Sequence, residues 1–325
     1  MMLLSSEVAK AMGGMREGGG GGLGVVGNLT WAEAQWVQIT SGWSDFQLYC
    51  CTFWILLAGY ILGALPYMIL DYLRIPFFEM YRLQPGFYND GRTIFKCCRD
   101  VMLVFFTTVL PLQLLSYPYF KVSGITGALP LPSLTTVVLQ LAVFFIIEDF
   151  GNYWIHRWFH NGWAYKYFHY KHHEFTTPMS FAASYAHPVE VLVLGIPTLA
   201  GPAIVKCHVL TLWLWINLRN WEALETHSGY DFPWALTKLI PFYGGAEYHD
   251  YHHLIGGKSQ GNFASVFTYC DWLYGTDKGY RFRKEFELKK MREMAMAQEQ
   301  GKMEASDGHN LANGSLPVEE KKKQV

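Results

Sequence analysis

The segment from Phe46 to Leu70 constrains the fold most, because its 25 consecutive residues carry no formal charge. Asp45 and Asp71 bracket it. About 20 apolar residues are enough for a helix to cross the hydrocarbon core of a bilayer, so this segment can span a membrane with some tilt. The sequence therefore predicts a transmembrane helix here, rather than a buried helix of a large soluble protein.

Four further apolar segments follow, at 101–120, 133–150, 189–205 and 209–218. The last two are short, and glycines and prolines interrupt the first of them, so they form either a re-entrant hairpin or a bent fourth and fifth span. The composition agrees, since 51% of the residues are hydrophobic and only 16% are charged. We predict an all-α, multi-pass integral membrane protein with about 3–5 membrane segments and a cytosolic, histidine-rich cap that binds two metal ions.

The chain divides into three regions. Residues 1–44 include five consecutive glycines, Gly18 to Gly22, and we expect a disordered tail because no GxGxxG spacing marks a phosphate-binding loop. Residues 45–282 form the membrane domain. Residues 283–325 form a charged tail that is helix-prone to about residue 300 and polar and disordered beyond it.

Charge and cysteine content exclude two classes of protein. The net charge of −1 does not mark a nucleic-acid-binding protein. The six cysteines include two adjacent pairs but no CxxC spacing, so they indicate neither a disulfide framework nor a thiolate metal site.

Basic residues indicate which ends of the spans face the cytosol. Five of them lie between the first two spans, whereas only Lys121 lies between the second and the third. The N-terminus is therefore predicted to be luminal and the histidine clusters cytosolic. Lys322 and Lys323, near the end of the chain, resemble the dilysine signal for retrieval to the endoplasmic reticulum; the alternative is a solvated basic tail.

Eight of the twelve histidines lie in three clusters. One has the spacing HxxxH and two have the spacing HxxHH: His156–His160, His169–His173 and His249–His253. Side chains three and four residues apart share a helix face, so each cluster is predicted to direct its imidazoles together. A single histidine is more often a packed or surface residue, but three such clusters predict a metal site.

Eight imidazoles favour two ions in a shared cage. The predicted ligands are His156, His160, His169, His172, His173, His249, His252 and His253. We expect His227 to join them, while His187 is either a further ligand or a residue that supports the ligands or packs in the core. Zinc hydrolases of the HExxH type place a glutamate where this chain has Arg157, so the membrane context favours iron and oxygen chemistry.

A helix that continues from the third span to the first histidine cluster would align four side chains on one face: Asp149, Tyr153, His156 and His160. Asp149 and Tyr153 are therefore candidates to orient the second ring nitrogen of a ligand. Alternatively, Asp149 caps the helix or pairs with Arg157 or Lys166. The metal centre itself is the expected catalyst, and the sequence assigns no catalytic side chain.

Oxygen chemistry at iron also needs a source of electrons. The sequence has no nicotinamide or flavin fingerprint and no cysteine set for an iron–sulfur cluster. A separate reductase or electron carrier is expected to dock at the cytosolic face.

Several segments resemble a known family. They are Ile147–His156, Ser184–Pro188, Glu225–Trp234, Gly244–His249 and Tyr274–Tyr280. With the histidine clusters, they are similar to the membrane-bound fatty acid hydroxylase superfamily of non-haem di-iron oxygenases, and more narrowly to plant sterol C-4 methyl oxidases of the 4,4-dimethylsterol type. The resemblance covers about residues 45–282.

This resemblance implies an oxidoreductase of the endoplasmic reticulum with two non-haem iron ions. Such a monooxygenase uses molecular oxygen, with electrons from NAD(P)H through cytochrome b5 and its reductase. It would oxidise a C-4 methyl group of 4,4-dimethylsterols such as 24-methylenecycloartanol through the alcohol and aldehyde to the carboxylate. A C-4 decarboxylating dehydrogenase and other sterol-demethylation enzymes would act with it.

One position departs from a related group. Fatty acid 2-hydroxylases carry a further histidine four residues before the equivalent of His227, where this chain has Ala223. This predicts a smaller ligand set, or one completed by His187 or by water. The alternative functions are a sterol C-5 desaturase, a hydroxylase acting on fatty acids or aldehydes, and a non-enzymatic membrane scaffold.

A sterol substrate would partition into the bilayer, so we expect a cavity that opens laterally between the spans and reaches the histidines. Its walls are predicted to come from the spans before His156 and from residues 189–218. The 3-hydroxyl group of the sterol should meet a polar side chain near the metals, and the candidates are Tyr153, Glu222 and Glu225.

Glycosylation tests the predicted orientation. Asn28-Leu29-Thr30 precedes the first span and forms a glycosylation acceptor, as does Asn313-Gly314-Ser315 near the other end. We expect Asn28 to carry a glycan and Asn313 to carry none, as measured by the mobility shift after endoglycosidase treatment. A protease-protection map that places the N-terminus and the histidine clusters on one side of the membrane would contradict the orientation.

Overall fold

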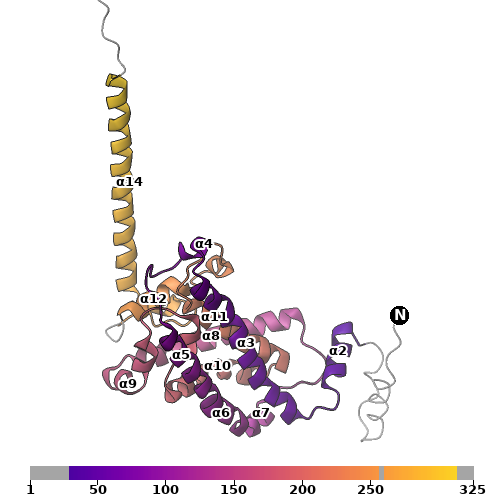
Figure 1. Ribbon diagram of the computed structural model, residues 1–325. Helices are drawn as coiled ribbons and strands as arrows, with labels where there is room; N and C mark the ends of the chain where they lie inside the picture. Colours follow the sequence, from indigo (N-terminus) through magenta and orange to yellow (C-terminus); the bar gives the residue numbers. More distant parts are fainter. Residues whose placement is uncertain (1–28, 256–259, 313–325) are drawn as a thin grey trace, which may run out of the picture. The chain divides into compact units, whose positions relative to one another are not determined.

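The computed structural model describes residues 29–255 and 260–312, and helices dominate throughout (Figure 1). Within these residues the only β-structure is three isolated bridges. The chain forms two compact units, the first ending at Thr276 and the second beginning at Asp277. The prediction of an all-α fold is confirmed.

The first unit contains α-helices and short 3₁₀- or π-helices (η). In order they are α2 (Trp31–Thr40), α3 (Asp45–Leu73), α4 (Pro76–Glu79), α5 (Gly91–Val104), η1 (Phe105–Val109), α6 (Leu110–Leu115), α7 (Tyr117–Ser123), α8 (Leu134–Phe159), α9 (Gly162–Tyr167), η2 (His169–Glu174), η3 (Ser180–Ser184), α10 (Pro188–Val205), α11 (Val209–Thr226), η4 (Leu236–Leu239), α12 (Gly245–Ile255) and α13 (Tyr269–Tyr274). The second unit consists of α14 (Lys278–Ala312), so the helix predicted to about residue 300 continues further. Lys322 and Lys323 lie outside the described residues.

Four helical segments of the described chain are long and apolar enough to cross a membrane. They are α3, the continuous segment Gly91–Leu115, α8 and α10. This confirms a multi-pass architecture. The second span, predicted at 101–120, instead covers Gly91–Leu115, because Asp90 caps α5 by accepting a hydrogen bond from the Thr93 amide. The first turns of this span carry Arg92, Lys96 and Arg99, so the apolar pattern of the sequence did not include them in the predicted span.

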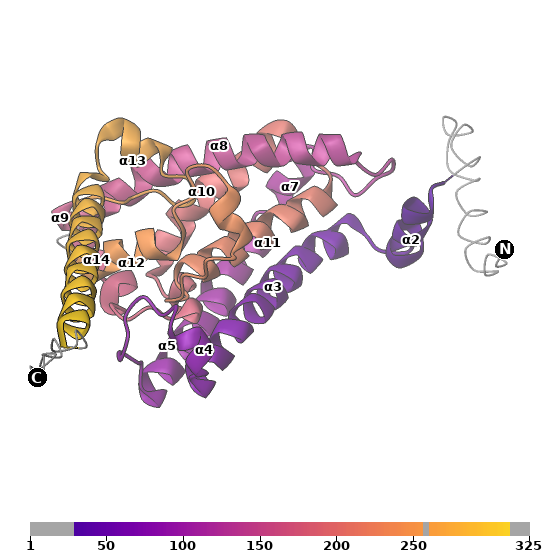
Figure 2. The same ribbon diagram turned by 90° about the horizontal axis from the view of Figure 1, so that it is seen from above.

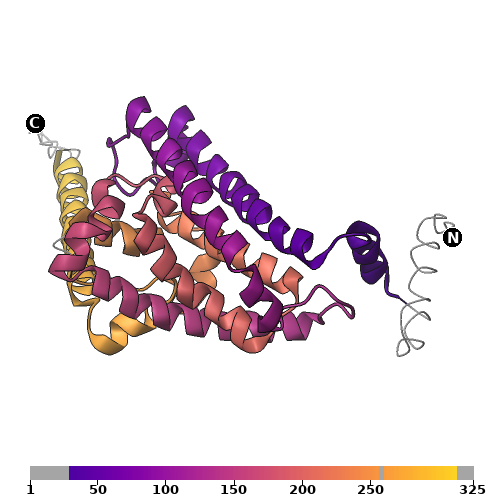
Figure 3. The ribbon, with the colours of Figure 1, turned by 90° about the horizontal axis from the view of Figure 1, so that it is seen from below.

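A proline explains the irregular centre of this second span. Residues Phe105–Val109 form a π-helical turn directly before Pro111. Proline cannot donate to the carbonyl four residues earlier and its ring clashes with that carbonyl, so widening the helix there relieves the clash. Figure 3 shows the segment α5–α6 lying beside α3.

The two short apolar segments form α10 and α11 (Figure 2). Helix α10 packs against α8, and α11 packs against α3. Helix α11 continues past the apolar segment that ends at residue 218, and this continuation contains Arg219 and Glu222.

Side-chain contacts place the loop between α4 and α5 at the histidine end of the bundle, together with the basic first turns of α5, where Lys96 pairs with Glu174 at 2.9 Å. There, the Gln84 amide donates to the Thr176 carbonyl and to Asp250, both at 2.8 Å. At the opposite end, the indole of Trp36 donates to the Gly127 carbonyl at 2.8 Å. The charge pattern and the histidines therefore mark the same end of the spans.

Helix α2 corrects the prediction of a disordered tail for residues 31–40. Thr30 and Glu33 form a capping box that starts this helix, and Trp36 is buried. The glycine-rich composition stops before Thr30, so composition alone did not describe this segment. Residues 1–28 lie outside the described residues.

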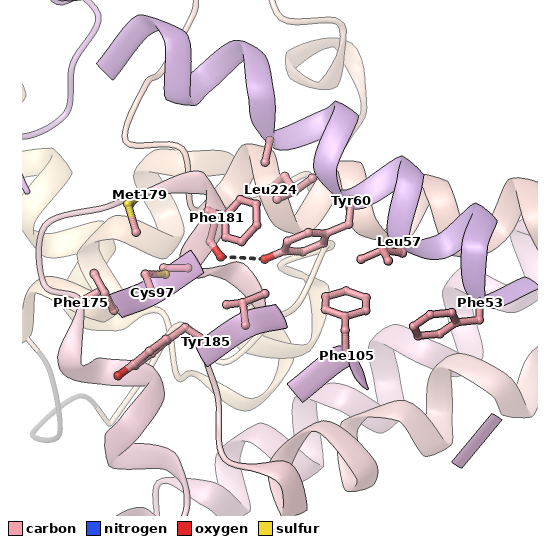
Figure 4. Close-up of a cluster of buried hydrophobic side chains, with 13 residues drawn as sticks. Phe53, Leu57, Tyr60, Cys97, Phe105, Phe175, Met179, Phe181, Tyr185 and Leu224 are labelled. Carbon is pink, nitrogen blue, oxygen red and sulfur yellow. Dashed lines mark hydrogen bonds between the residues drawn. The ribbon is translucent and has the colours of Figure 1, made fainter. Parts of the chain in front are cut away.

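An apolar cluster joins α3, α5, η3 and α11 (Figure 4). Tyr60, which is 1% exposed, donates its hydroxyl to the Phe181 carbonyl at 2.8 Å. Leu224 and Cys97 pack in the same cluster. This core fixes α11, which ends at His227, against the first two spans.

Helices α8 and α10 approach each other most closely at two glycines. A Cβ atom added at Gly201 would lie 2.9 Å from the Phe144 Cα, and one added at Gly151 would lie 2.6 Å from the Pro197 Cβ. A contact with backbone cannot move away as the end of a flexible side chain can. The close packing of these spans therefore requires small residues.

We expect Gly201→Val to lower the melting temperature in detergent by about 2–10 °C, because overpacking costs about 1–3 kcal/mol. Gly195→Ala is the matched control on the same helix, since an added Cβ there meets no atom within 4 Å. A Gly201→Val protein as stable as the wild type would contradict the close approach of these helices.

Candidate metal centre

Nine histidines converge on two separate centres within the described residues. The first group contains His156, His160, His169, His173 and His252. The second group contains His172, His227, His249 and His253. In each group, the ligand nitrogens all lie within 4.8 Å of one another. All eight clustered histidines, and the ninth predicted from outside the clusters, are thus brought together.

The two HxxHH clusters each serve both groups. His169 and His173 join the first group while His172 joins the second. In α12 the assignment is reversed, because His249 and His253 join the second group and His252 joins the first. The prediction that all three imidazoles of a cluster point together was wrong, since only the residues four apart do so.

Short distances between Nε2 atoms define both groups. In the first, the His169 Nε2 lies 3.1 Å from that of His156 and 3.0 Å from that of His160. In the second, the His249 Nε2 lies 2.9 Å from that of His227 and 3.0 Å from that of His253. Each group therefore presents its ring nitrogens to one common point.

Contacts on the opposite ring nitrogens show which tautomer is present. The Nδ1 atom lies 2.9 Å from the Phe263 carbonyl in His156, 2.9 Å from the Gly261 carbonyl in His252 and 2.7 Å from the Ala223 carbonyl in His227. A carbonyl only accepts, so Nδ1 carries the proton in these rings and Nε2 presents a lone pair. The converging nitrogens are therefore electron-pair donors.

Glu190 holds a fourth ring. Its carboxylate lies 2.8 Å from the His169 Nδ1, and both side chains are almost fully buried. Carboxylate–histidine pairs of this kind orient metal ligands and increase their basicity. Nothing in the spacing of Glu190, which follows His169 by 21 residues, had indicated this role.

The donor set fits metal ions. Imidazole nitrogens lie about 2.1 Å from a bound first-row ion, so neighbouring nitrogens of an octahedral set are about 3.0 Å apart. The observed separations of 2.9–3.3 Å match this value. Lone pairs facing each other at such distances repel, and a cation between them removes the repulsion.

Burial favours the form of histidine that binds metal. It lowers the pKa of His172, His249 and His253 well below the usual range. These imidazoles are therefore neutral near pH 7, and metal binding needs no loss of a proton from them.

Among the described residues, neither Asp149 nor Tyr153 makes a hydrogen bond to a histidine, which corrects the sequence-based assignment. Asp149 accepts hydrogen bonds from the Val266 and Phe267 amides, both at 2.9 Å. The Tyr153 hydroxyl instead lies 3.0 Å from that of Thr276. Asp149 thus holds the loop whose Phe263 carbonyl orients His156, and its predicted alternatives, Arg157 and Lys166, are not its partners.

His187 lies outside both groups. Its ring accepts a hydrogen bond from the Val189 amide and caps the N-terminus of α10. The structure therefore gives His187 a local role in starting a span, and the alternative of a further ligand is not supported by its position.

A cavity of about 430 Å³ leads to the histidines. Side chains from α3, the second span, α10 and α11 line it, as predicted for its walls. His156 and His169 of the first group open onto it, as do His172, His227 and His249 of the second. Both candidate metal positions therefore face one shared space.

Of the three polar residues predicted at this cavity, only Glu222 lines it. Glu225 accepts hydrogen bonds from Thr237 at 2.8 Å and Tyr243 at 2.7 Å, away from the lining. Asn152 and Arg219 line the cavity and had not been predicted. Asn152 precedes His156 by four residues, which places it on the same face of α8.

The chain is similar to known proteins in the region that holds this site. The profile described as Fatty acid hydroxylase matches residues 141–276, which contain all nine histidines. Methylsterol monooxygenase 1-2 of Arabidopsis thaliana is 54% identical over 82% of this chain and 89% of its own length. Very-long-chain aldehyde decarbonylase GL1-10 of Oryza sativa subsp. japonica is 50% identical over 87% of this chain and 93% of its own. No solved structure matches significantly.

The division of adjacent histidines between two groups predicts the metal content of variants. Purified protein should bind about two metal ions per chain, and either His252→Ala or His253→Ala should reduce this to about one. Inductively coupled plasma mass spectrometry on protein in mild detergent measures the content. His187→Ala is the control and should keep both ions, whereas a loss there would restore it as a ligand.

Proposed function

This chain belongs to the fatty acid hydroxylase family, and from that premise we propose that it is a methylsterol monooxygenase of the endoplasmic reticulum with two non-haem iron ions. The observation that carries the proposal is the opening of both histidine groups onto one cavity between apolar spans. The methylsterol monooxygenases that are about half identical to this chain support the same activity.

The histidines are proposed to hold the iron ions, and the iron would supply the activation of molecular oxygen that an unactivated C–H bond requires. The carbonyls of Phe263, Gly261 and Ala223 fix three of the rings as Nδ1-protonated tautomers. Glu190 orients the ring of His169 through its contact with Nδ1. These contacts hold the nitrogens in place before any ion binds.

The cavity is proposed to take a 4,4-dimethylsterol from the bilayer. Its lining on α10 extends from Glu190 to Ala203, which is about 20 Å at 1.5 Å per residue. This length suits an elongated apolar molecule that has one end at the histidines. Oxidation of one C-4 methyl group would proceed through the alcohol and the aldehyde to the carboxylate.

Electrons are proposed to come from NAD(P)H through cytochrome b5 and its reductase. The basic first turns of α5 lie at the histidine end, where Lys96 pairs with Glu174 at 2.9 Å, so a carrier bound at the cytosolic face would approach the metal centre. A C-4 decarboxylating dehydrogenase would then remove the carboxylate.

A second function is an aldehyde-acting enzyme. The observation that favours it is the rice relative named as a very-long-chain aldehyde decarbonylase, which is 50% identical to this chain. A long aldehyde would also fit an elongated apolar cavity, so shape alone does not separate the two substrates.

Turnover by microsomes separates these functions. Microsomes that contain this chain, given oxygen and NADH, should convert a 4,4-dimethylsterol to its 4-carboxy derivative, as measured by gas chromatography–mass spectrometry. The conversion should depend on cytochrome b5 and resist carbon monoxide. His252→Ala and His253→Ala should each abolish it, while His187→Ala should retain it.

Two products would contradict the proposal. Release of a shortened hydrocarbon from a long-chain aldehyde, with the sterol unchanged, would favour the second function. A new ring double bond with both C-4 methyl groups intact would indicate a desaturase.

A further inference from the structure

A buried polar cluster lies in the wall of the cavity beside the metal centre. It joins Glu148 and Asn152 of α8 to Arg219 and Glu222 of α11, and Ser265 of the following loop completes it. The guanidinium of Arg219 contacts Glu148 at 2.7 Å and Ser265 at 2.7 Å, and it also pairs with Glu222.

Burying these ionisable groups costs free energy, and this cost indicates that the cluster has a function. Glu148 is fully buried within a candidate span, and Asn152 is 6% exposed. Ionisable groups inside spans are expensive and usually mark substrate sites or ion paths. A stabilising role alone is a weak explanation, since buried ion pairs rarely offset their desolvation.

Unused hydrogen-bonding atoms show what the cluster lacks. Toward the described residues, the Asn152 Oδ1, the Glu222 Oε1 and the Arg219 Nε make no hydrogen bond. Two carboxylates oppose one guanidinium, so acceptors exceed donors in the cluster. The unused Asn152 Oδ1 and Glu222 Oε1 need a donor, and the unused Arg219 Nε needs an acceptor, so the missing partner is a group that both donates and accepts, as a hydroxyl does.

The position of the cluster matches the chemistry of a sterol. Asn152 lies one helical turn, or about 5.4 Å, before His156 on the same face of α8. In a 4,4-dimethylsterol, the hydroxyl is on the carbon next to the one that carries the methyl groups. A side chain that binds the hydroxyl must therefore lie beside the metal centre, as Asn152 does.

At the opposite end of the cavity, polar groups of the described residues bond to one another: the Tyr49 hydroxyl lies 2.6 Å from that of Ser116, and the Gln113 amide donates to the Tyr49 carbonyl at 3.0 Å. A molecule with one polar end would therefore enter with that end toward the histidines.

We propose that Asn152, Arg219 and Glu222 form the binding site for the substrate hydroxyl and thereby position the neighbouring C-4 methyl group at the metal centre. This inference rests on the proposed function, because it assumes a hydroxysterol substrate. Glu222 is a positioning residue whose carboxylate oxygen accepts a hydrogen bond from the substrate hydroxyl. Arg219 holds the Glu222 carboxylate at the cavity wall.

Replacing the hydroxyl by a ketone tests this site. A 3-keto-4,4-dimethylsterol has nearly the same shape but cannot donate a hydrogen bond. Microsomes with the wild-type chain should consume the hydroxysterol with a kcat/KM about ten- to hundredfold above that of the ketone.

The variant Glu222→Gln should weaken this preference. Arg219 only donates hydrogen bonds, so in this variant it should bond to the oxygen of the new side-chain amide. The NH₂ group of that amide would then face the substrate. The NH₂ group donates hydrogen bonds and therefore favours the ketone oxygen of the substrate. The ratio of the kcat/KM for the hydroxysterol to that for the ketone should fall by about tenfold or more. Glu225→Gln is the matched control on the same helix, and it should leave the ratio unchanged because Glu225 is bonded to Thr237 and Tyr243.

The outcomes separate the two proposals. An unchanged ratio in Glu222→Gln, with metal content and sterol oxidation retained, would overturn the hydroxyl site and leave the methylsterol monooxygenase in place. A wild-type chain that holds its metal but oxidises neither sterol would overturn the proposed function itself. If Glu222→Gln fails to accumulate, Asn152→Leu provides the second test, and an unchanged ratio there would also overturn the site.

Discussion

The mutual repulsion of nine converging imidazole nitrogens is the constraint on which the rest of this structure depends. Their Nε2 lone pairs meet about 3 Å apart, an arrangement that is favourable only around a cation. Contacts on the far side of the rings hold it open, namely three backbone carbonyls and Glu190. The loop that carries the Gly261 and Phe263 carbonyls is held in turn, since Asp271 accepts hydrogen bonds from the amides of residues 263 and 264 and Asp149 from those of residues 266 and 267.

The apolar bundle decides where polar chemistry occurs. Spans bury backbone polar groups within their own helices, so a buried charge among them needs a partner or a function. In this chain the ionisable side chains that face the cavity between the spans gather beside the histidines, where Arg219 and Glu222 line the wall. The apolar length of α10 leads away from them. A substrate with one polar end and an apolar body is oriented by this contrast alone.

The similarity to both methylsterol monooxygenases and an aldehyde decarbonylase is consistent with this division of roles. The histidine groups provide a site for metal that does not depend on the substrate. The residues of the cavity wall are separate from it, so they can select the substrate without altering the ligands. Asn152 links the two, because it lies one turn from His156 on α8.

The sequence by itself determined the features that depend on local order. The uncharged run ahead of Asp71 predicted a span, and α3 forms there. The spacing of His156 and His160 predicted a shared direction, and both join the first group, His156 from within α8 and His160 from its C-cap. Only the tertiary structure decided that His172 and His173 serve different centres, because neighbouring side chains diverge and their partners come from a distant helix. It also decided that Glu190, rather than Asp149, contacts a ligand. Contacts between residues far apart in the chain leave no periodic pattern, since they arise from the packing of helices against one another.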